Sequence, residues 1–320
     1  MRIAILDDYQ DVALTLADWS QVQRSAEITV FNDHVADMDT VAARLEPFEV
    51  VAIMRERTPF PGELLARLPN LKLLVTAGMR NLSIDLEAAT ERGVIVSGTD
   101  NVGVTTAELA WGLILGLARR IPEEDRATRA GQWQTSVGIS IGDKTLGIIG
   151  LGKVGGHVAK IGLAFGMDVI AWSQNLTPER CAEVGVRLAT KEELFATADF
   201  LSIHLVLSDR TRGLVGRDEL ALMKPSAYLV NTARGPIVQQ EALVEALEAG
   251  VIGGAGIDVY EPEPLPKDHP MRSLPRSIIT PHLGFVTDTN YKLWYGQIAE
   301  DIAAWMDGKP LRVLNPDALG

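Results

Sequence analysis

The sequence predicts an α/β protein with two Rossmann-like domains. Three observations favour this fold class: short apolar segments alternate with helical patterns over residues 1–96, the same alternation restarts at Lys144, and a glycine-rich turn follows an apolar run at Gly150. Strands that alternate with helices form parallel sheets whose two faces are covered by the helices. A chain of 320 residues is long enough for two such domains.

The first α/β segment contains five short apolar runs separated by helical patterns. Strands are expected at residues 2–6, 28–31, 50–53, 71–75 and 94–96. Helices are expected around residues 12–19, 38–45, 61–68 and 84–92. The loop at residues 76–81 follows a strand, and its backbone N–H groups could hold an anion there. A solvated turn is the alternative for this loop. Residues 54–58 follow another strand in the same manner, but there a solvated turn is favoured.

A long apolar helix is expected at residues 105–120, with Thr105 or Thr106 as its N-cap. Its apolar side chains occupy more than one face, so the helix must be buried or must contact another chain. We therefore expect a homodimer, with burial between domains as the alternative. Pro122 is expected to end this helix and to begin a polar stretch that reaches Trp133.

From Lys144 the alternation restarts as a second, doubly wound unit. Strands are expected at residues 146–149, 169–172, 200–203, 227–230, 256–259 and 277–280. Helices are expected at residues 153–165, 178–184, 216–223 and 239–249. A final helix at residues 288–306 follows this unit in sequence, yet it would give the first sheet a covering face.

The turn at Gly150 has the spacing of a dinucleotide-binding fingerprint. Gly150 allows a sharp turn, Gly152 lets a pyrophosphate approach the backbone, and Gly155 lets the helix lie close to the strand. The N–H groups and the positive dipole at the start of the helix would face the phosphates. Lys153 is followed by Val154 instead of Ser or Thr, which argues against a P-loop. The other alternative is a glycine-rich turn without a ligand.

Three later segments carry residues suited to acid–base chemistry. Arg234 follows a strand, and a guanidinium can bind a carboxylate substrate through two parallel hydrogen bonds. Glu261 and Glu263 lie in a proline-stiffened loop after the next strand. His282 lies between a proline and a glycine-bearing turn, where it can exchange protons near neutral pH while a nearby carboxylate holds its tautomer. These roles suffice for reversible hydride transfer at a 2-hydroxy or 2-oxo acid.

The chain resembles the D-isomer-specific 2-hydroxyacid dehydrogenase family over nearly its whole length. Four motifs carry the resemblance, in family order, at residues 150–155, 231–236, 256–264 and 280–284. The resemblance implies that Arg234 binds and polarises the substrate, that Glu263 is the carboxylate partner of the histidine, and that His282 is the general acid/base. Glu263 is preferred to Glu261 because the family's glutamate immediately precedes a Pro-Leu pair.

The resemblance also implies a domain organisation. A flavodoxin-like substrate domain would comprise residues 1–99 and 287–320, with a doubly wound dinucleotide-binding domain inserted at residues 100–286. The substrate carboxylate would lie on the amides of Ala77, Gly78 and Met79. The family's substrates are small 2-oxo acids and D-2-hydroxy acids, so glyoxylate and hydroxypyruvate are the compounds to test first.

The cofactor is expected to be NAD or NADP. The fingerprint, the strand ends and the resemblance together predict its binding residues: Gly150, Gly152, Lys153, Val154, Gly155, Ser173, His204, Thr232, Ala233, Asp258 and Gly284. Many NAD-binding units carry an acidic residue about 20 residues after the fingerprint, where it binds the ribose 2′-OH. Here the strand ends in Ser173, and Asp168 lies too early. We expect a slight preference for NADP, or use of both cofactors, with Arg180 as the nearest cation.

Composition excludes several other classes. The net charge of −12 and the pI near 4.9 argue against a nucleic-acid partner. No signal-peptide pattern is present, and no apolar run approaches the roughly 18 residues that a membrane span needs. Cys181 is the single cysteine and cannot form an internal disulfide, so a cytoplasmic location is expected. The histidines lack metal-ligand spacing, so no metal is expected.

Two other functions remain as alternatives. A formate or phosphite dehydrogenase could use the same scaffold with a different small-acid pocket. A nucleotide-sensing regulator could keep the fold without catalysis. The intact set of Arg234, Glu263 and His282 favours catalysis over sensing.

Overall fold

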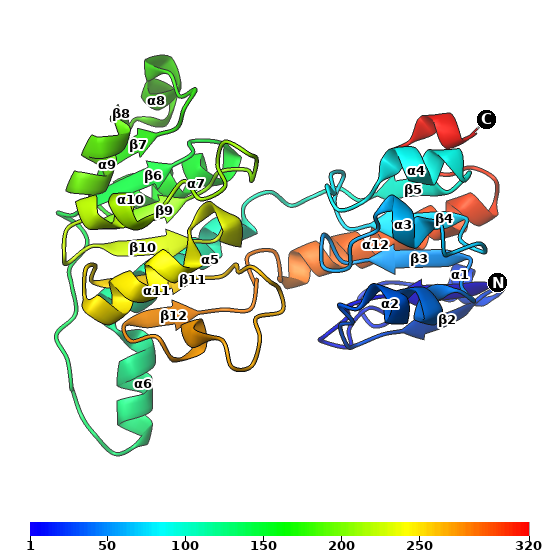
Figure 1. The fold of residues 1–320 in the computed structure, drawn as a ribbon, viewed down its shortest axis with the longest axis horizontal. Coiled ribbons are helices and arrows are strands. Elements are labelled where there is room, and N and C mark those ends of the chain that lie inside the picture. Colours follow the sequence, from blue (N-terminus) through cyan, green and yellow to red (C-terminus); the bar gives the residue numbers. More distant parts are fainter. Residues whose placement is uncertain (320) are drawn as a thin grey trace. The chain divides into compact units, whose positions relative to one another are not determined.

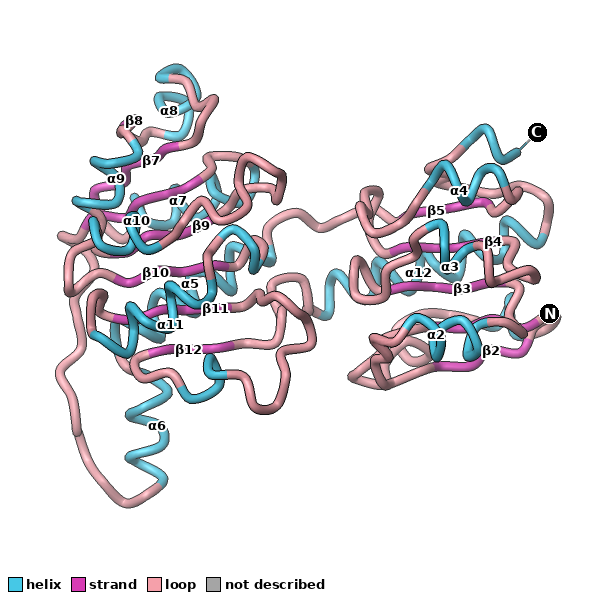
Figure 2. The backbone as a smooth tube through the Cα atoms, in the orientation of Figure 1, coloured by secondary structure: helices cyan, strands magenta, loops and turns pink. Residues whose placement is uncertain are grey.

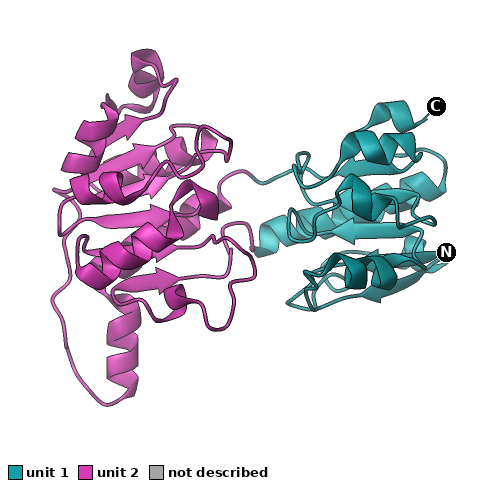
Figure 3. Ribbon diagram, viewed as in Figure 1, with its two compact units in different colours: residues 1–102, 287–320 teal, residues 103–286 magenta. Residues whose placement is uncertain are grey.

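The computed structural model of the protein describes residues 1–319 and divides into two compact units (Figure 3). Unit 1 contains residues 1–102 and the chain from Thr287 onward, and unit 2 contains residues 103–286. The first division thus falls after Val102 and not after residue 99. The reason is that Asp100 and Val102 are hydrogen-bonded to helix α12 (Asp288–Met306) of unit 1: the Trp294 indole donates to the Asp100 carbonyl at 2.8 Å.

Unit 1 is built on a five-stranded parallel sheet in the order β2-β1-β3-β4-β5. The strands are β1 (Arg2–Ile5), β2 (Glu27–Val30), β3 (Val50–Ile53), β4 (Leu73–Thr76) and β5 (Ile95–Gly98). The other helices of the unit are α1 (Ser20–Gln23), α2 (Met38–Leu45), α3 (Gly62–Leu65), α4 (Leu86–Glu91) and the 3-10 turn η3 (Pro316–Leu319). This strand order is the flavodoxin-like one, with a switch point between β1 and β3.

Helices cover both faces of this sheet (Figure 1). Ala4, Val51 and Leu74 point to one face, where they pack with the helices α2, α3 and α4 in one apolar cluster. Helix α12 packs on β4 and contacts α1. The segment after α12 then closes the edge of the sheet, because the Val96 amide donates to Asn315 Oδ1 at 2.8 Å and the Leu314 amide donates to the Val96 carbonyl at 2.7 Å.

The prediction of a helix around residues 12–19 is wrong. These residues form turns, because the buried carboxylate of Asp8 accepts hydrogen bonds from the amides of Val12 and Ala13 at 2.9 and 2.8 Å. The Trp19 indole donates to the Ala13 carbonyl and holds the turn closed. Regular α-helix begins only at Ser20. A side chain that bonds to nearby backbone amides competes in this way with helix formation.

Unit 2 is built on a seven-stranded parallel sheet in the order β12-β11-β10-β9-β6-β7-β8. Its strands are β6 (Thr145–Ile149), β7 (Asp168–Trp172), β8 (Arg187–Leu188), β9 (Phe200–Ile203), β10 (Tyr228–Asn231), β11 (Gly254–Ile257) and β12 (Ser277–Ile279). Its helices are α5 (Thr105–Arg119), α6 (Ile121–Arg129), α7 (Lys153–Ala164), α8 (Pro178–Val184), α9 (Lys191–Thr197), α10 (Arg217–Leu222) and α11 (Gln240–Ala249), with 3-10 turns η1 (Gly235–Ile237) and η2 (Pro270–Ser273). Counted from β6, this is the doubly wound Rossmann order with one strand added at the β12 edge.

Three elements of unit 2 were not expected from the sequence: helix α9, strand β8 and helix α6. Helix α9 begins at a clear N-cap, because the Thr190 hydroxyl accepts a hydrogen bond from the Glu193 amide at 3.1 Å. Its buried Leu194 and Phe195 join the core of the unit. Strand β8 has only two residues, which is too short for a sequence pattern to indicate.

The start of α5 also differs from the expectation. Val104 occupies the N-cap position without a side-chain hydrogen bond, while the hydroxyls of Thr105 and Thr106 donate to the Gly284 carbonyl at 3.0 and 3.1 Å. Pro122 lies in the first turn of a second helix, α6, so the polar stretch expected after this proline begins as a helix. Arg120, in the left-handed conformation with φ 54°, separates the two helices.

Helix α5 buries its apolar faces inside unit 2, where it packs on α7, β10, β11 and β12. By contrast, every residue of α6 is exposed or half-buried. A long loop follows α6 before β6 begins (Figure 2). No helix among residues 1–319 is both long enough and apolar enough to cross a membrane.

Candidate active site

The glycine fingerprint lies between β6 and α7, at the switch point of the unit 2 sheet. Gly150 has φ 95°, and a Cβ there would lie 2.8 Å from the His204 carbonyl oxygen. A Cβ on Gly155 would overlap the Gly150 carbonyl, so this glycine lets α7 approach the strand. A Cβ on Gly152 would meet no atom within 4 Å among the described residues, so this part of the turn opens to solvent.

Two further features at the same sheet edge fit a nicotinamide dinucleotide. Thr232 follows β10, and its buried hydroxyl has no hydrogen-bond partner within residues 1–319. A buried hydroxyl without a partner is costly unless a ligand satisfies it. His204 follows β9, and its Nε2 lies 2.9 Å from the Ser202 hydroxyl. Burial lowers the pKa of His204 to about 4, so its imidazole is neutral at pH 7.

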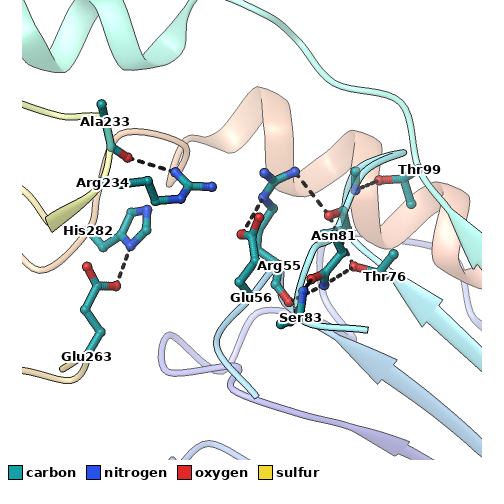
Figure 4. A network of polar contacts seen from close by, with 12 residues as sticks. Arg55, Glu56, Thr76, Asn81, Ser83, Thr99, Ala233, Arg234, Glu263 and His282 are labelled. Atoms are coloured by element: carbon teal, nitrogen blue, oxygen red, sulfur yellow. Dashed lines mark hydrogen bonds and ion pairs between the residues drawn. The ribbon is translucent and has the colours of Figure 1, made fainter. Parts of the chain in front are cut away.

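His282 and Glu263 form a pair in unit 2. The Nδ1 atom of His282 lies 2.5 Å from Glu263 Oε2 (Figure 4). The other carboxylate oxygen of Glu263 accepts a hydrogen bond from the Tyr260 amide at 2.8 Å. Glu261 lies apart from the imidazole, because its carboxylate pairs with Arg212 at 3.0 Å. A carboxylate on Nδ1 leaves Nε2 as the nitrogen that can exchange a proton with a substrate.

Asp258 fixes the backbone around His282. Its carboxylate accepts hydrogen bonds from the Thr280 hydroxyl at 2.6 Å, the Leu283 amide at 2.7 Å and the Gly284 amide at 2.9 Å. Its carbonyl accepts the His282 amide at 2.8 Å. His282 has φ 55°, a left-handed conformation that is unfavourable for a residue with a Cβ. Burial raises the pKa of the Asp258 carboxyl, while these hydrogen bonds oppose the rise.

Arg234 follows β10 in a turn shaped by buried Asn231. The Asn231 side chain accepts the Ala233 amide at 3.0 Å and donates to the Arg234 carbonyl at 3.0 Å. The Arg234 guanidinium donates to the Ala233 carbonyl at 2.8 Å (Figure 4). Gly235 then turns the chain against the Tyr260 backbone, where a Cβ would overlap.

In unit 1, the loop after β4 contains the expected carboxylate-binding amides. Two of the three already have acceptors: the Ala77 amide donates to the Ile53 carbonyl at 3.1 Å, and the Gly78 amide donates to the Thr99 hydroxyl at 2.8 Å. The Met79 amide and the next one, of Arg80, have no acceptor within residues 1–319. Successive free amides next to a residue with positive φ, here Gly78 at 90°, form an anion-binding concavity.

Several side chains of unit 1 hold this loop in shape. Asn81 is buried and donates to the Arg55 carbonyl at 2.8 Å and to Thr76 Oγ1 at 3.0 Å (Figure 4). Its carbonyl oxygen accepts the Ser83 amide at 2.9 Å. The Arg55 guanidinium lies over Gly78 and reaches the Ala77 carbonyl at 3.4 Å.

The residues whose hydrogen bonds hold the loops of the site in shape were not identified from the sequence. Asn231 and Asn81 each directly shape a turn, and Thr105 and Thr106 anchor the Gly284 carbonyl. A buried asparagine at the end of a strand is a recognisable signal, because its side chain can replace backbone hydrogen bonds in a turn. The threonine contacts join positions 178 and 179 residues apart in the chain, for which a single sequence carries no signal. Among residues 1–319, no cluster of three or more His, Cys, Asp or Glu side chains could hold a metal ion.

Comparison with known proteins agrees with this geometry. A family model described as D-isomer specific 2-hydroxyacid dehydrogenase, NAD binding domain, matches residues 111–284. A glyoxylate reductase of Aeropyrum pernix is 39% identical over 268 residues, which cover 80% of each chain. A D-3-phosphoglycerate dehydrogenase of Methanocaldococcus jannaschii is 39% identical over 263 residues, which cover 81% of this chain but only 50% of that one. The chain therefore spans about half the length of this second relative.

A solved structure is also closely similar. The crystal structure of a putative D-3-phosphoglycerate dehydrogenase oxidoreductase from Ralstonia solanacearum superimposes with a TM-score of 0.93 at 37% identity. The superposition covers 100% of this chain and 98% of that one.

Proposed function

The chain belongs to the D-isomer specific 2-hydroxyacid dehydrogenase family and transfers a hydride between a nicotinamide cofactor and a 2-oxo or 2-hydroxy acid, and from this premise we propose that it reduces small 2-oxo acids such as glyoxylate and hydroxypyruvate. The observation that carries the proposal is the contact of 2.5 Å between His282 and Glu263, which gives unit 2 an oriented acid/base. The similarity to the glyoxylate reductase of Aeropyrum pernix, which covers 80% of that chain, supports glyoxylate as the first substrate to test.

In the proposed mechanism, His282 is the general acid/base. Protonated His282 donates the Nε2 proton to the carbonyl oxygen during reduction, and it keeps its Nδ1 proton, which is donated in a hydrogen bond to the Glu263 carboxylate. Arg234 binds the substrate and stabilises the negative charge that develops on the carbonyl oxygen. A bound NADH or NADPH supplies the hydride. In oxidation, neutral His282 accepts the hydroxyl proton.

The substrate carboxylate is proposed to bind the loop at Ala77, Gly78 and Met79. Because the amides of Ala77 and Gly78 already have acceptors, the Met79 and Arg80 amides are the donors that we assign to the carboxylate. Gly78 contributes its positive φ, which no residue with a Cβ adopts readily.

The cofactor is proposed to lie along the fingerprint and the neighbouring strand ends. Gly150, Gly152 and Gly155, with Lys153 and Val154 at the start of α7, would face the pyrophosphate. Ser173 would face the adenosine ribose. The remaining residues proposed for binding are His204, Thr232, Ala233, Asp258 and Gly284. Ser173 in place of a carboxylate supports use of NADP as well as NAD, with a slight preference for NADP.

Steady-state assays test this function. We would assay glyoxylate, hydroxypyruvate and pyruvate with NADPH and with NADH, and formate and phosphite with NADP and with NAD. Turnover of the 2-oxo acids supports the proposal, whereas oxidation of formate or phosphite alone would assign the other activity to the scaffold. Binding of the cofactor without turnover of any compound would instead indicate a nucleotide-sensing regulator.

Two further properties are proposed from the sequence and the surface. The protein is proposed to be a homodimer that associates through α6 and the loop after it, since α5 is already covered inside unit 2. The cytoplasm is its proposed location, with Cys181 as a free, buried thiol.

A further inference from the structure

Arg180 of helix α8 lies against the fingerprint turn. Its Nε donates to the Leu151 carbonyl at 3.3 Å, and its Nη2 lies 3.3 Å from the position that a Cβ on Gly156 would occupy. Leu151 is the residue between the first two fingerprint glycines. Arg180 is thus next to the fingerprint in space, although it is 29 residues away in sequence.

The end of β7 reaches the same turn without a negative charge. The Gly150 amide donates to the Trp172 carbonyl at 2.9 Å, so Ser173 follows directly beside the fingerprint. In Rossmann units that prefer NAD, an acidic residue at this strand end binds the ribose 2′-OH and would repel a 2′-phosphate. Here a serine at the strand end and a guanidinium at the turn favour an anion.

The guanidinium already has one anionic partner. Glu183, one turn further along α8, accepts from Arg180 Nη1 at 2.8 Å. The side chains are 43% and 64% exposed, so this ion pair is weak and can exchange in solvent. A phosphate carries more charge than a carboxylate and offers three oxygens, which makes it a stronger partner for a guanidinium.

We propose that Arg180 binds the 2′-phosphate of NADPH and that Glu183 competes with this phosphate for the guanidinium. This inference rests on the proposed nicotinamide-dependent function. It explains use of both cofactors by one site: Ser173 admits the phosphate, Arg180 binds it, and Glu183 limits the preference. Arg180 is then a specificity residue, with no part in hydride or proton transfer.

Binding measurements test the proposal without turnover. Calorimetry would compare 2′,5′-ADP with 5′-AMP, and NADPH with NADH, on the full-length protein. We expect Arg180→Gln to weaken 2′,5′-ADP and NADPH by about tenfold, as for the loss of a charge-assisted hydrogen bond, and to change 5′-AMP and NADH by less than about twofold. Glu183→Gln should strengthen the phosphate ligands by about twofold to fivefold.

Two controls separate specificity from structure. Arg187→Gln breaks a comparable exposed pair in the same unit, with Glu193 at 2.6 Å, and should leave all four affinities unchanged. Ser173→Asp should weaken the ligands with a 2′-phosphate and spare the others. An equal loss of 5′-AMP and 2′,5′-ADP in Arg180→Gln would show that Arg180 only shapes the turn and would overturn the proposal. Affinities for 5′-AMP and 2′,5′-ADP that are both unchanged in this variant would overturn the proposal as well.

These outcomes are independent of the reaction itself. If the ligands bind as expected but no 2-oxo acid is reduced, the proposed function fails while the assignment of Arg180 stands. If 2-oxo acids are reduced but Arg180→Gln leaves the ratio of the NADPH and NADH affinities unchanged, only the assignment of Arg180 fails.

Discussion

His282 occupies an unfavourable backbone conformation that its neighbours hold in place. Three donors converge on the Asp258 carboxylate, and two of them, the amides of Leu283 and Gly284, follow His282 directly. Glu263 then fixes the ring through Nδ1. The orientation of His282 therefore depends on two carboxylates. Asp258 binds the backbone amides that follow His282, and Glu263 binds its imidazole.

Removing the imidazole or its partner gives the first prediction. We expect His282→Asn to lower kcat by about 10²–10⁴-fold, because general acid/base catalysis is lost, while NADH affinity stays the same. Glu263→Gln should lower kcat by a smaller factor, since the ring is present but poorly held. Glu261→Gln is the matched control, because its carboxylate faces Arg212, and its kcat should be near that of the wild type. Equal kcat values for the Glu261 and Glu263 variants would contradict the pairing.

Asp258 gives a second prediction at this scale. Asp258→Asn replaces one oxygen by an NH₂ group, which cannot accept from the amides of Leu283 or Gly284. We expect a loss of about 1–3 kcal/mol in the free energy of unfolding, as for a buried group left without its partner, together with a lower kcat. Urea unfolding and steady-state kinetics would measure the two effects. An unchanged kcat in a destabilised variant would show that the loop around His282 does not depend on this carboxylate.

At the scale of elements, the sequence predicts those helices and strands whose apolar residues are regularly spaced. The strand at residues 50–53 and the helices at 38–45, 178–184 and 288–306 have the expected bounds, because their apolar spacing is regular. The pattern around residues 12–19 is equally regular, yet Asp8 captures its amides and forms turns. The positions of Arg234, Glu263 and His282 at loop ends could be read from motifs. The role of Asn231 could have been inferred from its place at a strand end, whereas the contact of Thr105 with Gly284 depends on chain packing and could not be inferred.

Helix α12 contains a buried carboxyl that makes stability depend on pH. Asp301 is fully buried, and its Oδ1 lies 2.8 Å from Arg312 Nη2. Burial raises the pKa of Asp301 to about 7, although Arg312 lowers it. Between pH 4 and 7 the folded protein therefore keeps a proton that the unfolded chain has released, at an unfolded pKa of about 3.9. The contribution of this group to the free energy of unfolding falls as the pH rises through that range.

Asp301→Asn tests this dependence. The variant cannot titrate, so the free energy of unfolding of the wild type, relative to the variant, should fall by roughly 1–4 kcal/mol between pH 4.5 and 7.5. Urea unfolding at both pH values would measure it. Asp288→Asn on the same helix is the control, because the pKa of exposed Asp288 is lowered, chiefly by its hydrogen bond to Lys292, and its effect should be nearly equal at both pH values. A difference that stays constant for Asp301→Asn would refute the raised pKa.

At the scale of the molecule, each unit is a doubly wound sheet with functional loops at the carboxyl ends of its strands. In unit 2 the loops that carry the proposed site residues follow β6, β9, β10, β11 and β12, and in unit 1 the proposed anion-binding loop follows β4. This arrangement follows from parallel strands, since all their carboxyl ends meet at one edge. It explains why motifs far apart in the sequence gather at one edge of unit 2.

The exposed surface of unit 2 gives the last prediction. Ile121 at the start of α6 is 54% exposed, and Trp133 and Val137 in the following loop are 78% and 93% exposed. Helix α6 carries Glu123 and Glu124 in its first turn and Arg126 and Arg129 in its last turn. Two copies packed antiparallel along a twofold axis would bring opposite charges together and cover the apolar side chains.

Charged substitutions on this surface should therefore separate the proposed dimer. We expect Trp133→Asp combined with Val137→Asp to convert the protein to a monomer in light scattering at micromolar concentration, because an interface core tolerates few charges. Leu222→Asp is the matched control: Leu222 is also exposed, at 48%, but lies in α10, and this variant should stay dimeric. A wild-type protein that is monomeric would contradict the proposed dimer. A double variant that remains dimeric would show that the subunits associate through another surface. Retained cofactor binding by the monomer would show that unit 2 folds its fingerprint without the partner.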